Sequence, residues 1–177
     1  GIGTINPIGN NIEEYFTNLE NGVSGAAKIT LFDATNFKSR IACEVKNYDW
    51  SKYFDRKEVR KYDRFCQFAL VAATEAVEDA NFDFDALDKE RAGVVWGSGI
   101  GGIQSFHDEV MGWAEGDGIP RFSPFFVPHL ITDIAAGHKP DADWCNRSEL
   151  DCSLDCHKRV AGYNYTAEHC CNIGHER

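Results

Sequence analysis

The strongest restriction on the fold comes from a short apolar run that passes directly into a glycine-rich loop. Residues 92–96 are Ala-Gly-Val-Val-Trp, and residues 97–102 are Gly-Ser-Gly-Ile-Gly-Gly. An apolar run that contains β-branched residues and is followed by glycines predicts a buried strand. Apolar residues at helical spacing follow, which predicts a helix over 103–115. A strand that leads through a glycine loop into a helix indicates an α/β fold.

Apolar spacing predicts further helices and strands in the first part of the chain. The helix signals include an N-cap at Asn10 or Asn11 and stops at Asn21 and Asn81. The strand signals are short apolar or alternating runs between polar turns. The predicted ranges are 12–20 and 56–80 for helices, 29–32 and 40–45 for strands, and 130–136 for the start of a last helix.

Charge and cysteine content exclude several classes of protein. The net charge is −10, which argues against non-specific nucleic-acid binding. No apolar run approaches the roughly 20 residues that span a bilayer, and no signal-like segment is visible. Seven cysteines, with irregular spacing, make a poor disulfide framework. We therefore expect a reduced, cytoplasmic protein without a membrane or nucleic-acid partner.

The character of the sequence changes at Lys139. Residues 139–177 show no sustained period of two or 3.6, and they are rich in Cys, His, Asp and Asn. They have neither the pattern of a core element nor the low complexity of a linker. We therefore predict one domain over residues 1–138, followed by a tail of different origin over 139–177.

Several short segments in a fixed order carry a resemblance to a known family. Each is a weak signal alone, but their shared order and spacing are specific. The chain resembles the elongating β-ketoacyl-acyl-carrier-protein synthases of type II fatty acid synthesis over residues 1–138. The matching segments are Gly1-Ile2-Gly3, Asn6 to Asn10, Arg56 to Lys61, Gly97 to Gly102, Ser123 to Pro128 and Asp133 to His138.

The resemblance implies a fold and an activity. The expected fold is the α/β thiolase-like layered fold, of which this chain holds an incomplete N-terminal half, and the family assembles as a homodimer. Its members are acyltransferases that condense an acyl chain with malonyl-acyl carrier protein and release carbon dioxide. A cysteine thiolate holds the acyl group and two histidines stabilise the enolate, without a cofactor.

The sequence departs from the family after His138. The resemblance predicts a nucleophile strand there, but this sequence has Lys139-Pro140-Asp141-Ala142, and no later segment matches the catalytic histidines. Reading the underlying codons one nucleotide later allows family-like strings such as Gly-Pro-Asn and Thr-Ala-Thr-Ser-Gly, in the expected order. We therefore hypothesise that the tail is an out-of-frame translation. No residue is predicted to be catalytic.

A basic cluster is the candidate partner site. Four basic residues recur at i, i+3, i+4 and i+7 of the predicted helix, and so share one face: Lys57, Arg60, Lys61 and Arg64. Such a run is often a solvated face, but the rest of the chain is acidic. By resemblance, Lys57, Arg60 and Lys61 match positions that dock the acidic acyl carrier protein. Arg121 is a weaker member of the patch.

The glycine loop and an aromatic pair are the candidate acyl pocket. The loop lacks the spacing of a nucleotide-binding motif, which favours close backbone packing instead. By resemblance, Ile100 lies beside the acyl pocket and gates chain length, although a plain core residue is the alternative. Phe125 and Phe126 match a segment near the dimer interface that lines the partner's acyl tunnel.

The cysteines and histidines give weaker candidates. Cys66 lies mid-helix and Cys43 within a strand, so we interpret both as inert small hydrophobes. The tail holds two pairs at spacings that zinc sites use, Cys152 with Cys156 and His169 with His175.

The sequence as a whole leaves three hypotheses for the function of the chain: a synthase fragment, a non-catalytic module that binds acyl carrier protein, and a variant with a zinc-stabilised tail. No metal site is predicted.

Overall fold

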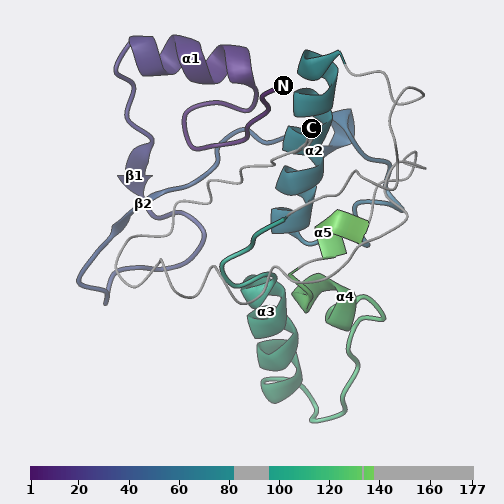
Figure 1. The fold of residues 1–177 in the computed structure, drawn as a ribbon. Helices are drawn as coiled ribbons and strands as arrows, with labels where there is room; N and C mark the ends of the chain where they lie inside the picture. The colour runs from purple at the N-terminus through teal and green to yellow at the C-terminus, as the bar shows by residue number, and fades with distance from the viewer. Residues whose placement is uncertain (82–95, 133, 138–177) are drawn as a thin grey trace.

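The computed structural model describes residues 1–81, 96–132 and 134–137. Helix α2 stands at the centre, with α1 and a two-stranded sheet to one side, α5 to the other, and α3 with α4 below (Figure 1). None of the helices in these ranges is long and apolar enough to cross a membrane. The elements are α1 (Ile12–Glu20), β1 (Ala26–Lys28), β2 (Ile41–Cys43), the 3₁₀ helix η1 (Trp50–Lys52), α2 (Arg64–Ala80), α3 (Ile103–Ala114), α4 (Phe126–Leu130) and α5 (Ile134–Gly137).

Local side chains set the ends of α1. The side chain of Asn11 accepts a hydrogen bond from the Glu14 backbone N–H at 2.8 Å, and the Glu14 carboxylate accepts one from Asn10 N–H at 2.8 Å. The arrangement differs from a capping box, because Glu14 accepts from the residue before the N-cap, but it likewise satisfies two N–H groups at the helix start. The helix ends at Asn21, which is its C-cap. The predicted limits of this helix are confirmed.

Helix α2 begins eight residues later than the sequence pattern predicts. Its N-cap is Asp63, whose side chain accepts a hydrogen bond from Phe65 N–H at 3.3 Å. Asn81 takes a left-handed conformation (φ 46°) and ends the helix, as predicted. The prediction of helix over 56–63 was wrong, because an N-cap side chain starts a helix wherever it satisfies the first N–H groups.

A separate turn occupies the preceding residues. The Asp55 carboxylate accepts hydrogen bonds from the backbone N–H groups of Lys57 and Glu58, at 2.6 and 2.7 Å. The Glu58 carboxylate accepts one in return from Asp55 N–H at 3.0 Å. These bonds close a compact turn that does not propagate into α2.

The two strands pair antiparallel, and the first is displaced from its predicted position. Strand β2 lies within the predicted range 40–45, but β1 ends before the predicted range 29–32 begins. The reason is a side chain: the Glu44 carboxylate accepts hydrogen bonds from the backbone N–H groups of Thr30 and Leu31, at 3.0 and 3.3 Å. These N–H groups are therefore not available to continue the ladder.

The hydrophobic core lies on two sides of α2. One cluster joins α2 to α5 and to the residue before the glycine loop; its members are Tyr62, Cys66, Ala69, Leu70, Trp96 and Ala135. The other joins α2 to the N-terminal segment, through Ile5, Phe68 and Val71. Trp96 is 5% exposed, as a buried strand end would be, and the rest of the strand predicted over 92–96 lies outside the described residues.

Helix α3 is confirmed, and the predicted helix over 130–136 is wrong in part. Helix α4 ends at Leu130, Ile131 is extended (φ −69°, ψ 117°), and α5 begins at Ile134. The break occurs where the glycine loop meets the end of α4: a Cβ on Gly101 would lie 2.7 Å from the Leu130 carbonyl oxygen. Tight backbone packing therefore separates the two helices.

Candidate functional site

The basic cluster lies on the turn before α2, and we call its four exposed cations Arg56, Lys57, Arg60 and Lys61 the cationic turn. The prediction that one helix face carries Lys57, Arg60, Lys61 and Arg64 was wrong, because α2 begins at Arg64 and the other three lie before it. The four cations of the turn instead lie on a main chain that hydrogen bonds to the Asp55 carboxylate hold in a compact conformation. Hydrogen bonds from the N–H groups of Glu58 and Lys57 are the main cause of a lowered Asp55 pKa, and nearby lysines add to it. The Asp55 carboxylate therefore stays ionised near neutral pH.

The two remaining basic candidates are engaged elsewhere. The Arg64 guanidinium donates a hydrogen bond to the Val45 carbonyl at 3.2 Å and lies 5.2 Å from the centre of the Phe68 ring. It thereby ties the segment after β2 to the start of α2. Arg121 forms an ion pair with Asp117 at 2.8 Å, on the α3–α4 connection (Figure 1). Local pairing therefore reduces the charge that Arg121 offers to a partner.

The glycine loop packs against backbone, as the sequence analysis favoured. Gly101 has a left-handed conformation (φ 71°), and its N–H donates to the Ser98 hydroxyl at 3.1 Å. A Cβ on Gly102 would overlap the His129 carbonyl oxygen and lie 2.9 Å from an Asp63 carboxylate oxygen. Glycine is therefore required here for contact with α4 and with the start of α2.

The acyl-pocket candidates are only partly buried. Phe126 stacks between two other aromatic rings, with centroids 5.9 Å from Phe106 and 5.1 Å from Phe122. Phe125 stacks on the ring of His129 at 6.3 Å. Ile100 is 42% exposed, which is inconsistent with a plain core residue. Its side chain therefore has free surface that an acyl chain or another protein segment could cover.

The described cysteines do not form a nucleophilic site. Cys66 is fully buried within α2, where burial raises the pKa of its thiol to about 12, so it stays protonated near neutral pH. The interpretation of Cys66 as an inert hydrophobe fits this environment. Cys43 lies in a strand, as predicted, but unlike Cys66 it is exposed.

The histidines within the described ranges have structural or surface contacts. His107 lies 3.1 Å from the Asp108 carboxylate on the exposed side of α3. The His129 ring lies 3.0 Å from the Arg60 carbonyl oxygen. Across these ranges, no group of three or more His, Cys, Asp or Glu side chains could hold a metal. His138 and the cysteines and histidines of the tail lie outside the described residues.

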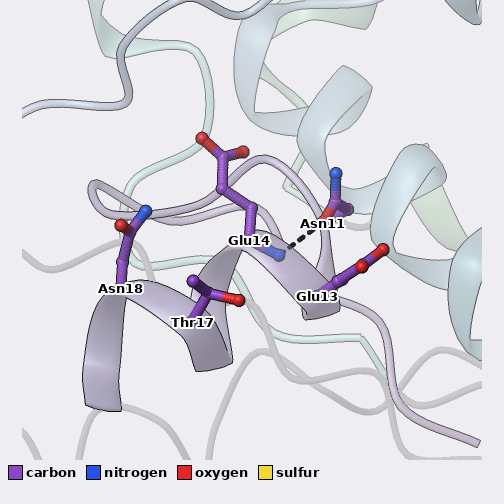
Figure 2. A pocket seen from close by; sticks show the side chains of 5 residues that line it. All are labelled: Asn11, Glu13, Glu14, Thr17 and Asn18. Atoms are coloured by element: carbon purple, nitrogen blue, oxygen red, sulfur yellow. Dashed lines mark hydrogen bonds between the residues drawn. The ribbon is translucent and has the colours of Figure 1, made fainter. Parts of the chain in front are cut away.

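A shallow hollow of about 330 Å³ lies on α1 (Figure 2). Its lining residues are polar, and two of them, Asn11 and Glu14, are joined by the hydrogen bond that caps the helix (Figure 2). Since two of its polar groups already serve as caps, the hollow offers few free groups to a ligand. It is lined by Asn11, Glu13, Glu14, Thr17 and Asn18.

Two contacts that join the candidate regions were not predicted from the sequence. The His129 ring meets Arg60 across 69 positions, and the Ser105 hydroxyl donates to the Asp63 carboxylate across 42. The Asp63 cap itself was detectable, because an Asp directly before an apolar helical pattern is a start signal. The long-range partners had no local signal.

Comparisons with known proteins agree over this part of the chain. The family model for the beta-ketoacyl synthase N-terminal domain matches residues 1–139. The 3-oxoacyl-[acyl-carrier-protein] synthase 2 of Staphylococcus aureus is 44% identical over 140 residues, which are 77% of this chain and 34% of that protein. The chain thus spans about a third of the length of the curated relatives it matches.

Solved structures share the fold. The ishigamide ketosynthase/chain length factor matches with a TM-score of 0.66 and 29% identity, over 76% of this chain and 34% of that one. A ketosynthase solved with its type II PKS acyl-carrier protein matches with a TM-score of 0.59 and 24% identity, over 77% and 35%. The α/β, thiolase-like class predicted from the sequence is confirmed for this partial N-terminal half. The chain belongs to the beta-ketoacyl synthase family.

Proposed function

We propose that this chain is the N-terminal portion of a 3-oxoacyl-[acyl-carrier-protein] synthase of fatty acid biosynthesis. The complete enzyme would be a cytoplasmic acyltransferase that joins acyl chains to malonyl-acyl carrier protein and releases carbon dioxide. The name of the Staphylococcus aureus relative supports this assignment. The catalytic cysteine would lie outside residues 1–138, since Cys66 is buried with a raised pKa and Cys43 lies exposed on β2. The catalytic histidines of the family would lie outside this range too.

The cationic turn is the observation on which the proposed partner depends. Its four cations are exposed on a protein of net charge −10, and none of them makes an ion pair with another described residue. Unpaired charge against an opposite background attracts an acidic partner and orients it. The turn, with Arg64 and Arg121 as outlying members, would therefore receive acyl carrier protein.

Charge reversal tests this docking surface. The double variant Lys57→Glu/Lys61→Glu should weaken binding of acyl carrier protein roughly tenfold at low salt, with a smaller effect at high salt. The double variant Lys38→Glu/Arg40→Glu, at two exposed cations of the β1–β2 connection, is the matched control and should leave binding within twofold. Fluorescence anisotropy with labelled carrier protein measures both. Equal losses in the two variants would reject a specific docking surface.

The proposed acyl pocket involves Ile100, Phe125 and Phe126. The free surface of Ile100 and the aromatic stacks around Phe126 support this role. A larger side chain at the gating position, as in Ile100→Phe, should shift the products of the complete synthase toward shorter chains. Gas chromatography of the released fatty acids measures the shift, and an unchanged distribution would remove Ile100 from the pocket.

A second candidate function is a non-catalytic module that binds acyl carrier protein. The exposed cationic turn and the buried, protonated thiol of Cys66 support this second function as well as the first. The two functions differ in turnover. A complete synthase that contains this chain would form 3-oxoacyl product, whereas a non-catalytic module would bind acyl carrier protein without forming product. Carrier-protein binding combined with an assay for 3-oxoacyl product separates them.

We also propose that residues 139–177 are an out-of-frame translation. The support is the abrupt loss of the family pattern after His138, together with the family-like strings that the possible codons allow in the neighbouring frame. Sequencing the coding DNA across codons 137–177 tests it. A neighbouring frame that resumes the family pattern supports the proposal, and the absence of such a frame rejects it.

A further inference from the structure

The His129 side chain makes a long-range contact with the cationic turn. Its ring nitrogen Nε2 lies 3.0 Å from the backbone carbonyl oxygen of Arg60. A carbonyl oxygen can only accept a hydrogen bond, so Nε2 carries the hydrogen and donates it. This bond joins α4 to the turn between Asp55 and Asp63, and it fixes the main chain at one of the four cations.

Two further contacts hold His129 in place. Its ring stacks on Phe125, with centroids 6.3 Å apart and planes inclined by 21°. Its own carbonyl oxygen packs against Gly102, where a Cβ would overlap it. The ring that reaches Arg60 is therefore supported by an aromatic stack, while the glycine loop holds the His129 main chain.

A second connection links the same regions through Asp63. This residue follows the cationic turn and caps α2, and its carboxylate accepts a hydrogen bond from the Ser105 hydroxyl in the first turn of α3. The same carboxylate lies beside Gly102. The main chain around Arg60 is thus connected by these contacts to α2, α3, α4 and the glycine loop.

We propose that His129 is a positioning residue, whose hydrogen bond to the Arg60 carbonyl orients the Arg60 side chain toward an acidic protein partner. This inference rests on the proposed docking of acyl carrier protein to the cationic turn. His129 itself need not touch the partner. Its contribution is to limit the conformations of the Arg60 backbone, so that less freedom is lost when the guanidinium engages a carboxylate.

Two substitutions separate the hydrogen bond from the ring. His129→Phe keeps a ring that can stack on Phe125 but removes the donor, whereas His129→Gln keeps an N–H donor in a similar place. The Phe variant should weaken binding of acyl carrier protein roughly threefold to tenfold, the range that one hydrogen bond supports. The Gln variant should stay within twofold of the original. His107→Phe, an exposed histidine on α3, is the matched control and should not change binding.

A double-mutant cycle with Arg60→Ala shows whether His129 acts through the Arg60 side chain. Arg60→Ala keeps the backbone carbonyl, so the hydrogen bond from His129 can still form. If His129 acts only by orienting that side chain, His129→Phe should have no further effect on binding in the Arg60→Ala background. Binding is measured by anisotropy, and circular dichroism and a thermal melt on each variant verify that it is folded.

The outcomes distinguish this inference from the function on which it depends. Additive losses in the cycle, or an equal loss in the folded Gln and Phe variants, overturn the positioning role. If Arg60→Ala lowers the affinity for acyl carrier protein and His129→Phe does not, the positioning role is also overturned, although the proposed docking surface stands. If the original chain and Arg60→Ala bind carrier protein equally weakly, the proposed docking fails and the role of His129 fails with it.

Discussion

Helices α2 and α3 are both amphipathic, but only α2 is covered. Helix α2 has eight buried residues, which face the N-terminal segment on one side and Trp96 and α5 on the other. Helix α3 has no buried residue, although it packs against α4. Its large apolar side chains, together with those of the α3–α4 connection and α4, remain on the surface: Ile103, Phe106, Met111, Trp113, Ile119, Phe122 and Val127.

The difference shows that an apolar helix face does not specify what covers it. The same 3.6-residue pattern leads to a buried core around α2 and to an exposed apolar surface on α3 and α4. A contiguous exposed apolar patch marks a surface that contacts other protein. We propose that a second copy of the chain covers these exposed side chains.

The largest expected effect on stability concerns the packing of the N-terminal segment against α2. In Gly3→Ala, the new Cβ would overlap the Ala72 carbonyl oxygen and lie 2.6 Å from the Ala76 nitrogen, both backbone atoms of α2. Because neither atom can move without disturbing the helix, we expect a loss of about 2–3 kcal/mol in the free energy of unfolding. Urea denaturation followed by circular dichroism measures it. An unchanged midpoint would mean that the N-terminal segment does not pack on α2.

The next effect concerns the buried thiol of α2. Cys66→Ser places a hydroxyl at a fully buried position, which should reduce the free energy of unfolding by about 1–2 kcal/mol. The exposed Cys43 provides the control, since Cys43→Ser should change it by less than about 0.5 kcal/mol. Equal effects would indicate that α2 is not the core helix.

The Cys66 thiol also predicts a pH dependence. Burial raises its pKa to about 12 in the folded state, whereas an unfolded thiol titrates near 8.5. The thiol therefore contributes stability that is complete below about pH 8.5 and is lost as the pH rises toward 12. The stability difference between the original chain and Cys66→Ser should consequently shrink between pH 8 and pH 10. A constant difference across that range would contradict a raised pKa.

A smaller effect, opposite in sign, is expected on α3. Gly112 lies within the helix, and a Cβ there would meet no atom within 4 Å. Gly112→Ala should therefore raise the free energy of unfolding by about 0.5–1 kcal/mol, the difference in helix propensity. It is the same chemical change as Gly3→Ala, so the pair tests packing directly. Destabilisation at Gly112 would reveal a neighbour on this face.

The smallest effect on folding is expected at Val127, which is 60% exposed on α4. Val127→Ser should change the free energy of unfolding by less than about 0.5 kcal/mol. If a second copy covers this surface, the dissociation constant of the dimer should rise roughly tenfold, because each subunit loses buried apolar area. Sedimentation velocity measures it, with the exposed Val23→Ser as the control. A dimer unaffected by Val127→Ser would place the interface elsewhere.

Much of the fold was predictable where its causes are local. The limits of α1 depend on Asn11, Glu14 and Asn21, and all three signals lie within one turn of the helix ends. The end of α2 at Asn81 is equally local. The candidate site was predictable in part: Lys57, Arg60 and Lys61 were identified from charge and spacing, but Arg56 was not, and the placement on a helix face was wrong.

The sequence alone determined where several helices begin and end, which residues are basic in an acidic chain, and that Cys66 is a core residue. Tertiary structure alone decided that Glu44 ends β1, that Gly102 packs on His129, and that His129 holds Arg60. The physical reason is range. A cap or a helical period acts over three or four residues, whereas these contacts join residues 14 to 69 positions apart, so they exist only once the chain has folded.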